Sequence, residues 1–223
     1  MRYIRPLKPT TNLLALILLV AAPLAAVTPV EDIAKRVDRQ YNELRTLSAD
    51  FVEIYRGLGM SRTESGTLWL KKPGKMRWDY RQPREKLFLI DGKTAFFYVP
   101  GDRQARKTAV KNLDDLRSPL RYLLGKTKLQ KEFESLAIAA EVQPLTAGNI
   151  VLRGLPRHLA ERVSRVLLEI TPQGRIDRIL AEEVDGSTTE FRFSNQREDV
   201  ALADSSFRFS IPPGVEMIEA ATF

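Results

Sequence analysis

The residues that could do chemistry in this sequence are few and scattered. The only histidine, His158, lies in the polar stretch LPRHLAER, which is more typical of a surface position than of a general base. The acids Glu182, Glu183 and Asp185 are clustered, but neighbouring strand residues point to opposite faces, which favours a solvated sheet edge over a paired-carboxylate site. The Gly-Leu-Gly at 57–59 lacks the third glycine of a nucleotide fingerprint. We therefore expect no enzyme.

The composition removes further classes of site. The 223 residues include no cysteine, which excludes a disulfide, a thiol nucleophile and a thiolate metal site. With a single histidine as well, we expect no metal and no cofactor. The net charge is +7, but Lys and Arg are interleaved with acids along the chain, so we do not expect a nucleic-acid partner.

The first 26 residues have the order of a secretory signal peptide. Basic Arg2, Arg5 and Lys8 precede the apolar run 13–22, and small residues follow at Ala25 and Ala26. The run is short for a membrane span, so an uncleaved anchor is the weaker alternative. We expect residues 1–26 to be a signal peptide and residues 27–223 to be one exported domain.

The spacing of apolar residues changes once along this domain. Ile33, Val37, Tyr41, Leu44 and Leu47 recur every three or four residues, which predicts a first helix. A period of two then predicts strands over 49–56, 64–71, 75–80, 86–90, 94–99 and 104–108, and later over 149–152, 163–170, 175–184 and 187–195, with a final extended piece near 207–211. Short helices are expected over 118–125 and 129–136. Short turns favour antiparallel pairing, so we predict a large antiparallel sheet that curls, with the inserted helices covering its concave side.

Large apolar side chains gather on one face of this predicted sheet. The strands around the turn at 73–74 place Leu68, Leu70, Met76, Trp78 and Tyr80 on a common face, and we expect Phe96 and Tyr98 on the concave side with them. Phe97 and Val99 then fall on the opposite face. The alternatives are a sealed core and the wall of a pocket for an apolar ligand.

Several stretches in a fixed order resemble the LolA family, the periplasmic carriers of outer-membrane lipoproteins. They are LSADFVEIY, GTLWLKKPGKMRWDYRQP, LFLIDGKTAFFYVPGDRQA and DSSFRFSIPPGVEMI. The resemblance implies a mainly β fold with some α, an incomplete, half-open antiparallel β-barrel covered by a lid of short helices. It also implies a monomeric carrier that takes lipoproteins from an inner-membrane ABC transporter to a LolB-like outer-membrane acceptor. The acceptor is itself a lipoprotein, so the absence of cysteine argues against that role.

The resemblance also implies roles for individual residues. The acyl-chain cavity would be lined by Leu68, Leu70, Met76, Trp78, Tyr80, Phe96 and Tyr98, and the lid would contribute Leu120, Leu123 and Leu124. Lys72 stands where the family has a basic residue, usually arginine, that bonds to the lid backbone and keeps the empty carrier closed. Two alternatives stay open: a LolA-like carrier of another lipid, such as a glycolipid or hopanoid, and an RseB-type envelope-stress sensor, which would require a second domain.

Overall fold

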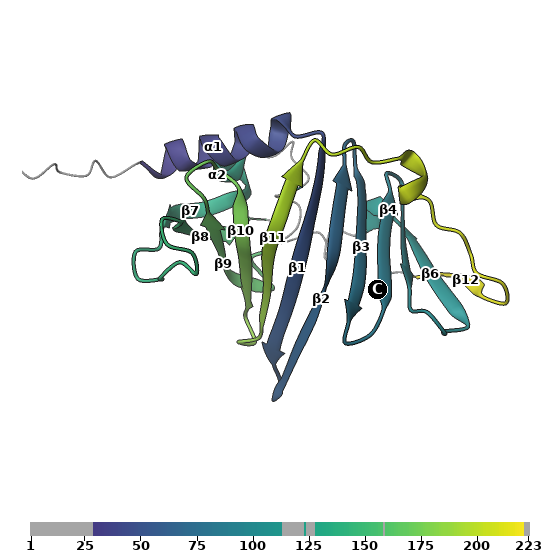
Figure 1. The fold of residues 1–223 in the computed structure, drawn as a ribbon. Coiled ribbons are helices and arrows are strands. Elements are labelled where there is room, and N and C mark those ends of the chain that lie inside the picture. The colour runs from purple at the N-terminus through teal and green to yellow at the C-terminus, as the bar shows by residue number, and fades with distance from the viewer. Residues whose placement is uncertain (1–28, 113–122, 124–127, 158, 221–223) are drawn as a thin grey trace, which may run out of the picture.

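A computed structural model of the chain describes residues 29–112, 123, 128–157 and 159–220 (Figure 1). The helical elements are α1 (Val30–Glu43), η1 (Val110–Asn112), α2 (Leu129–Glu132) and η3 (Asp204–Phe207). The strands are β1 (Thr46–Gly57), β2 (Met60–Lys71), β3 (Lys75–Gln82), β4 (Lys86–Asp91), β5 (Thr94–Tyr98), β6 (Gln104–Ala109), β7 (Phe133–Ile138), β8 (Ile150–Pro156), β9 (Val163–Ile170), β10 (Ile176–Glu183), β11 (Thr188–Glu198) and β12 (Glu216–Glu219).

All twelve of these strands belong to one open, curled sheet, in the order β12-β6-β5-β4-β3-β2-β1-β11-β10-β9-β8-β7. Neighbouring strands are antiparallel except β12, which lies parallel to β6. Within the described residues, the edge strands β12 and β7 do not pair with each other, so the barrel is incomplete. The sequence-based prediction of a half-open, mainly antiparallel sheet is confirmed.

Helix α1 lies across one end of the strands on the β7–β11 side of the sheet (Figure 1). Its stripe of Ile33, Val37 and Tyr41 is buried at 1–2% exposure, whereas Leu44 and Leu47 follow the helix and continue the same core. The Tyr41 hydroxyl accepts a hydrogen bond from the backbone N–H of Ile176 on β10, at 3.0 Å. Packing and this bond together fix the helix against the sheet.

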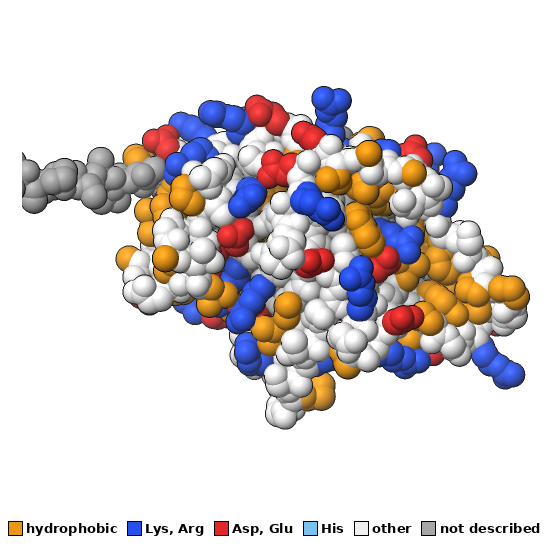
Figure 2. All heavy atoms as spheres, viewed as in Figure 1, with side chains coloured by type: hydrophobic (Ala, Val, Ile, Leu, Met, Phe, Trp, Pro, Cys, Tyr) orange, Lys and Arg blue, Asp and Glu red, His pale blue; other side chains and the backbone are white. Residues whose placement is uncertain are grey.

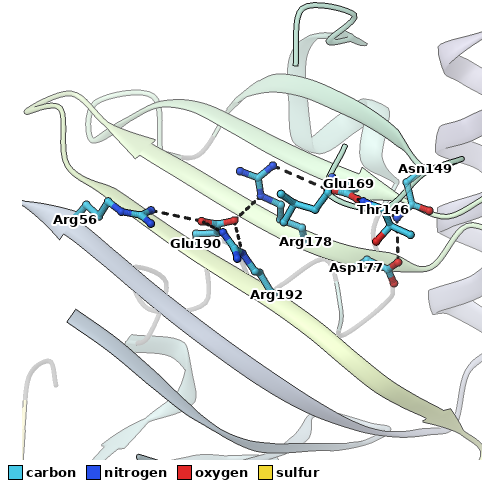
Figure 3. A network of polar contacts seen from close by, with 9 residues as sticks. Arg56, Thr146, Asn149, Glu169, Asp177, Arg178, Glu190 and Arg192 are labelled. Atoms are coloured by element: carbon cyan, nitrogen blue, oxygen red, sulfur yellow. Dashed lines mark hydrogen bonds and ion pairs between the residues drawn. The ribbon is translucent and has the colours of Figure 1, made fainter. Parts of the chain in front are cut away.

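The convex side of β8–β11 holds a polar network (Figure 3). Glu169 is 1% exposed and accepts hydrogen bonds from the backbone N–H groups of Leu145 and Thr146 and from the side-chain amide of Asn149, at 2.9–3.0 Å. Glu190, also 1% exposed, accepts from Arg178 at 2.6 Å and from Arg192 at 2.8 Å. These buried carboxylates are therefore fully engaged in the structure.

The chain after β11 crosses to the convex side of β3 and β4, and the extended piece expected near 207–211 does not join the sheet as a strand. Phe207 ends η3 and is 1% exposed. Lys71 donates to the Leu202 carbonyl and pairs with Asp204 at 2.8 Å, and Arg77 donates to the Ser206 carbonyl at 3.0 Å. The final strand, β12, follows this piece and was not predicted from the sequence. The predicted helix over 129–136 is also shorter, because α2 ends at Glu132 and β7 begins at once.

Candidate functional site

The concave face of the sheet brings together the first group of predicted site residues. Leu68, Leu70, Met76 and Trp78 are 0–3% exposed and belong to one hydrophobic cluster with the stripe of α1. Their common face follows from the register, in which Leu70 lies opposite Met76, and Leu68 opposite Trp78. In the structure described, this face is covered, so a ligand could reach it only after some of the covering residues move.

Aromatic side chains from three further strand positions extend this face, and the sequence analysis did not single them out. Phe51 of β1 lies 4.6 Å from Trp78 between ring centroids, and Phe191 and Phe193 of β11 lie 5.5 and 6.3 Å from it. The available signal was the alternation of Phe191 and Phe193 in TEFRFS. It placed both on one face, but only the pairing of β1 with β11 shows that this is the face of Trp78.

Phe96 and Tyr98 lie on the convex side, so the prediction that they share the face of Trp78 is wrong. Trp78 is paired with Phe88, and Phe88 with Phe97, which makes Phe97 the concave residue of β5. Phe96 instead stacks on Phe209 at 5.2 Å, and Tyr98 lies 6.1 Å from the same ring. Figure 2 shows hydrophobic side chains gathered on the side of the molecule where β4, β5, β6 and β12 lie.

Lys72 contacts α1 in the described part of the chain. Its Nζ donates a hydrogen bond to the backbone carbonyl of Tyr41, in the last turn of the helix. The carbonyls of a last turn lack intrahelical donors, and this turn of α1 has no basic residue of its own. Lys72 therefore supplies the cation that the C-terminal end of α1 favours, and it links the β2–β3 turn to that helix.

The predicted lid residues fall mostly outside the described residues. Leu120 and Leu124 are not described, and neither is His158. Leu123 is described and is 1% exposed, within the hydrophobic cluster that contains Leu70, Met76 and Trp78. One leucine of the predicted lid thus packs with the predicted cavity wall.

Tyr80 marks the change from apolar to charged side chains on the concave face. Its hydroxyl donates to Glu53 at 2.7 Å, and the Nζ of Lys86 lies 4.1 Å from the centre of its ring. Lys86 in turn donates to Glu64 at 2.6 Å, and the Nε of Arg62 lies 3.2 Å from the same carboxylate. We call Glu53, Arg62, Glu64, Tyr80 and Lys86 the polar cluster.

Burial dominates the electrostatics of the polar cluster. It raises the pKa of Glu53, although the hydrogen bond from Tyr80 acts in the opposite direction. Burial, with the nearby charge of Glu53, also raises the pKa of the Tyr80 hydroxyl well above its usual value. The hydroxyl therefore keeps its proton and donates to the carboxylate.

The acids that had suggested a paired-carboxylate site have structural partners. Glu182 forms two hydrogen bonds with Arg165, at 2.7 and 3.0 Å. Asp185 accepts from the backbone N–H and the hydroxyl of Ser187, at 2.8 and 2.7 Å, and these bonds lower its pKa. Glu182 therefore ties β10 to β9, and Asp185 holds the β10–β11 turn in place.

Residues 42–210 match the sequence model of one family, "Outer membrane lipoprotein carrier protein LolA". This chain belongs to the LolA family. It is 31% identical over 179 residues to an outer-membrane lipoprotein carrier protein of Nitrosospira multiformis, which covers 78% of this chain and 82% of that protein. A carrier protein of Chromobacterium violaceum is 26% identical over 205 residues, covering 89% of this chain and 93% of the relative.

A solved structure of low sequence identity shares the fold. An uncharacterised conserved protein of Thermus thermophilus superposes with a TM-score of 0.55 at 12% identity, covering 85% of this chain and 98% of that one. None of the helices in the described ranges has the length and apolar character needed to cross a membrane. The family is one of lipoprotein carriers, and the concave apolar face is the candidate binding site of this chain.

Proposed function

We propose that this protein carries lipoproteins across the periplasm, holding their acyl chains on the concave face. Residues 1–26 are removed on export, and the carrier then collects cargo from an inner-membrane ABC transporter and delivers it to an acceptor at the outer membrane. The observation that supports this best is the continuous wall of Leu68, Leu70, Met76 and Trp78, which belongs to one hydrophobic cluster with the apolar stripe of α1 on an open sheet. Such a wall can accept chains of varied length because it is apolar and, at Met76, flexible.

Opening must precede binding, because this wall is covered in the structure. Lys72 and the hydroxyl of Tyr41 hold α1 against the sheet, and Leu123 packs over the wall. Acyl chains would replace these apolar contacts with their own at little net loss of buried surface. Loading and release then depend on a small difference in free energy between the closed and the open form. The carrier itself therefore needs no ATP.

The test is to isolate the tagged protein from the periplasmic fraction and identify what it retains by mass spectrometry. We expect acylated lipoproteins with the wild type and none with Trp78→Glu, since an unpaired charge on an apolar wall costs several kcal/mol, about 3 or more. Trp69→Glu is the matched control, because Trp69 lies on the opposite face of its hairpin, near Arg77. Retention of a free glycolipid or hopanoid instead would contradict lipoprotein cargo, and recovery only in washed membranes would contradict a periplasmic carrier.

A further inference from the structure

The concave face has a direction, from apolar at one end to charged at the other. Along β1, β2 and β3 the facing rows are Leu47–Leu70–Met76, then Ala49–Leu68–Trp78, then Phe51–Gly66–Tyr80, then Glu53–Glu64. Rows on one face of a strand are about 7 Å apart, so the change occurs within about 20 Å. The apolar end is the one nearest the C-terminal end of α1, and the charged end is toward the β1–β2 hairpin tip (Figure 1).

The charged end is balanced. The polar cluster contains two carboxylates, Glu53 and Glu64, and two cations, Arg62 and Lys86. The side chains of Glu53, Glu64 and Lys86 are only 7–18% exposed, whereas Arg62 is 54% exposed. Because the charges compensate one another, this end suits a neutral polar group with hydrogen-bond donors and acceptors better than a free ion.

Trp78 has a buried hydrogen-bond donor at the boundary between the two ends. Its Nε1 makes no hydrogen bond to any described residue, which is unusual for an indole in a protein interior. Its ring also contacts Phe51, Tyr80, Phe191 and Phe193, which belong to the third and fourth rows and thus lie toward the polar end. A carbonyl oxygen of a bound ligand would satisfy this donor.

We propose that Trp78 and the polar cluster form the site for the carbonyl-bearing linkage of the cargo. The ester or amide carbonyl of an acyl chain accepts a hydrogen bond from Trp78 Nε1, and the neutral glyceryl and peptide groups lie against Tyr80, Glu53 and Lys86. The acyl chains then run toward Leu70 and α1, and the polypeptide leaves at the end where the β1–β2 hairpin turns. This orientation rests on the proposed function. It adds that the carrier recognises the linkage between the acyl chains and the polypeptide.

Photo-crosslinking of the wild-type protein tests the orientation directly. One synthetic diacylglyceryl-cysteine lipopeptide has a diazirine beside its cysteine, and a second has it at the end of an acyl chain. We expect the first to label residues 53–64 or 80–86, and the second to label residues 70–76 or α1. The reverse assignment would overturn the orientation, whereas absence of labelling and binding by both probes would contradict the proposed function itself.

A pair of lipids tests the role of Trp78 separately. The diacyl lipopeptide has ester carbonyls, and its dialkyl ether analogue has none. For Trp78→Phe we expect the preference for the ester over the ether probe to fall by roughly 3- to 10-fold, the value of one hydrogen bond, because any lost packing affects both probes alike. Trp69→Phe should leave the preference unchanged. An unchanged ester-to-ether ratio in Trp78→Phe would show that its indole does not bind the linkage.

Discussion

At the level of single residues, the carboxylates of the polar cluster set the charge of the concave face. Glu53 and Glu64 lie directly opposite each other on β1 and β2. Like charges in that position oppose each other, and burial adds to the effect at Glu53. Tyr80, Lys86 and Arg62 offset this repulsion: Tyr80 donates to Glu53, Lys86 donates to Glu64, and Arg62 lies near both carboxylates. Several neighbours therefore stabilise the two carboxylates, rather than one ion pair.

The raised pKa of Glu53 leads to a pH-dependent prediction. The native state holds the Glu53 proton more tightly than the unfolded chain, whose carboxyl titrates near 4.5. Stability therefore falls as the pH rises from about 4.5 through the higher native pKa. We expect Glu53→Gln to match wild type below this range and to exceed it at neutral pH, by on the order of 0.5 kcal/mol, or about 1–2 °C in Tm.

Thermal unfolding between pH 4 and pH 8 measures this difference. Asp79→Asn serves as the control, because Asp79 pairs with Arg77 at 2.8 Å on the convex face of β3 and has no facing carboxylate partner in its cross-strand row. It should give no gain at neutral pH. A Glu53→Gln variant that is less stable than wild type at neutral pH, with a difference that vanishes at acid pH, would show that the Tyr80 hydrogen bond outweighs burial.

At the level of elements, the alternation of apolar and polar residues predicted most strands. It could not predict which residues face inward in a strand where every residue is apolar. In β5 every residue from Ala95 to Tyr98 is apolar, so a period of two cannot decide which ones face inward. The decision comes from register: Trp78, Phe88 and Phe97 follow one another across β3, β4 and β5. That information lies in pairings between strands and is absent from any single segment.

The C-terminal segment shows a second limit of local patterns. The alternating FRFSI sequence predicted an extended piece over 207–211, but the alternation marks no strand of the sheet: Phe207 is buried, and Phe209 stacks on Phe96 on the convex side. The pairing of β12 with β6 joins residues more than a hundred positions apart, and no local signal encodes it. The concave wall was predictable because one tight hairpin, β2–β3, fixes its register by itself.

The contact between Lys72 and α1 gives the prediction at this scale. We expect Lys72→Leu to destabilise the closed form by about 1–2 kcal/mol, because a charged donor to a helix C-terminus is lost. The variant should load an acyl probe at least as well as wild type but transfer it to an acceptor more slowly, since the closed form no longer competes with the loaded one. Fluorescent-lipopeptide binding and a transfer assay measure both steps.

The neighbouring lysine provides a matched control for Lys72. Lys71→Leu removes the same charge, but Lys71 binds Leu202 and Asp204 on the convex side. Its loading and transfer should match wild type. Lys72→Arg should load an acyl probe no faster than wild type and should still transfer it, because the guanidinium keeps the charge and the hydrogen-bond donors. Equal transfer by wild type and Lys72→Leu would show that this contact does not govern release.

At the level of the whole molecule, the two faces of the sheet are built for different tasks. Many contacts on the convex side are polar, among them the network around Glu169 and Glu190 on β8–β11 (Figure 3). The C-terminal segment is held there by the pairing of Asp204 with Lys71 and Lys75 and by the packing of Phe207 and Phe209. Lys71 and Lys75 lower the pKa of Asp204 to about 2, so its carboxylate is charged and can pair with both lysines at neutral pH. The concave side is held mainly by apolar packing, which a lipid can replace.

This division predicts that stability and binding can be altered separately. Burial opposes the charge of Glu190, but Arg192 and Arg178 outweigh it and lower its pKa, so at neutral pH the carboxylate is charged and binds both guanidinium groups. Glu190→Gln leaves Arg178, which is 13% exposed, without its closest partner. We expect a loss of about 2 kcal/mol, or roughly 4–8 °C in Tm, with the affinity of the folded protein for an acyl probe unchanged at low temperature.

Glu134→Gln, which breaks a half-exposed pair with Arg157, should shift Tm by no more than about 1–2 °C. A fall in affinity that tracks the fall in Tm would show instead that the convex network shapes the concave wall, and that the two faces act as one unit.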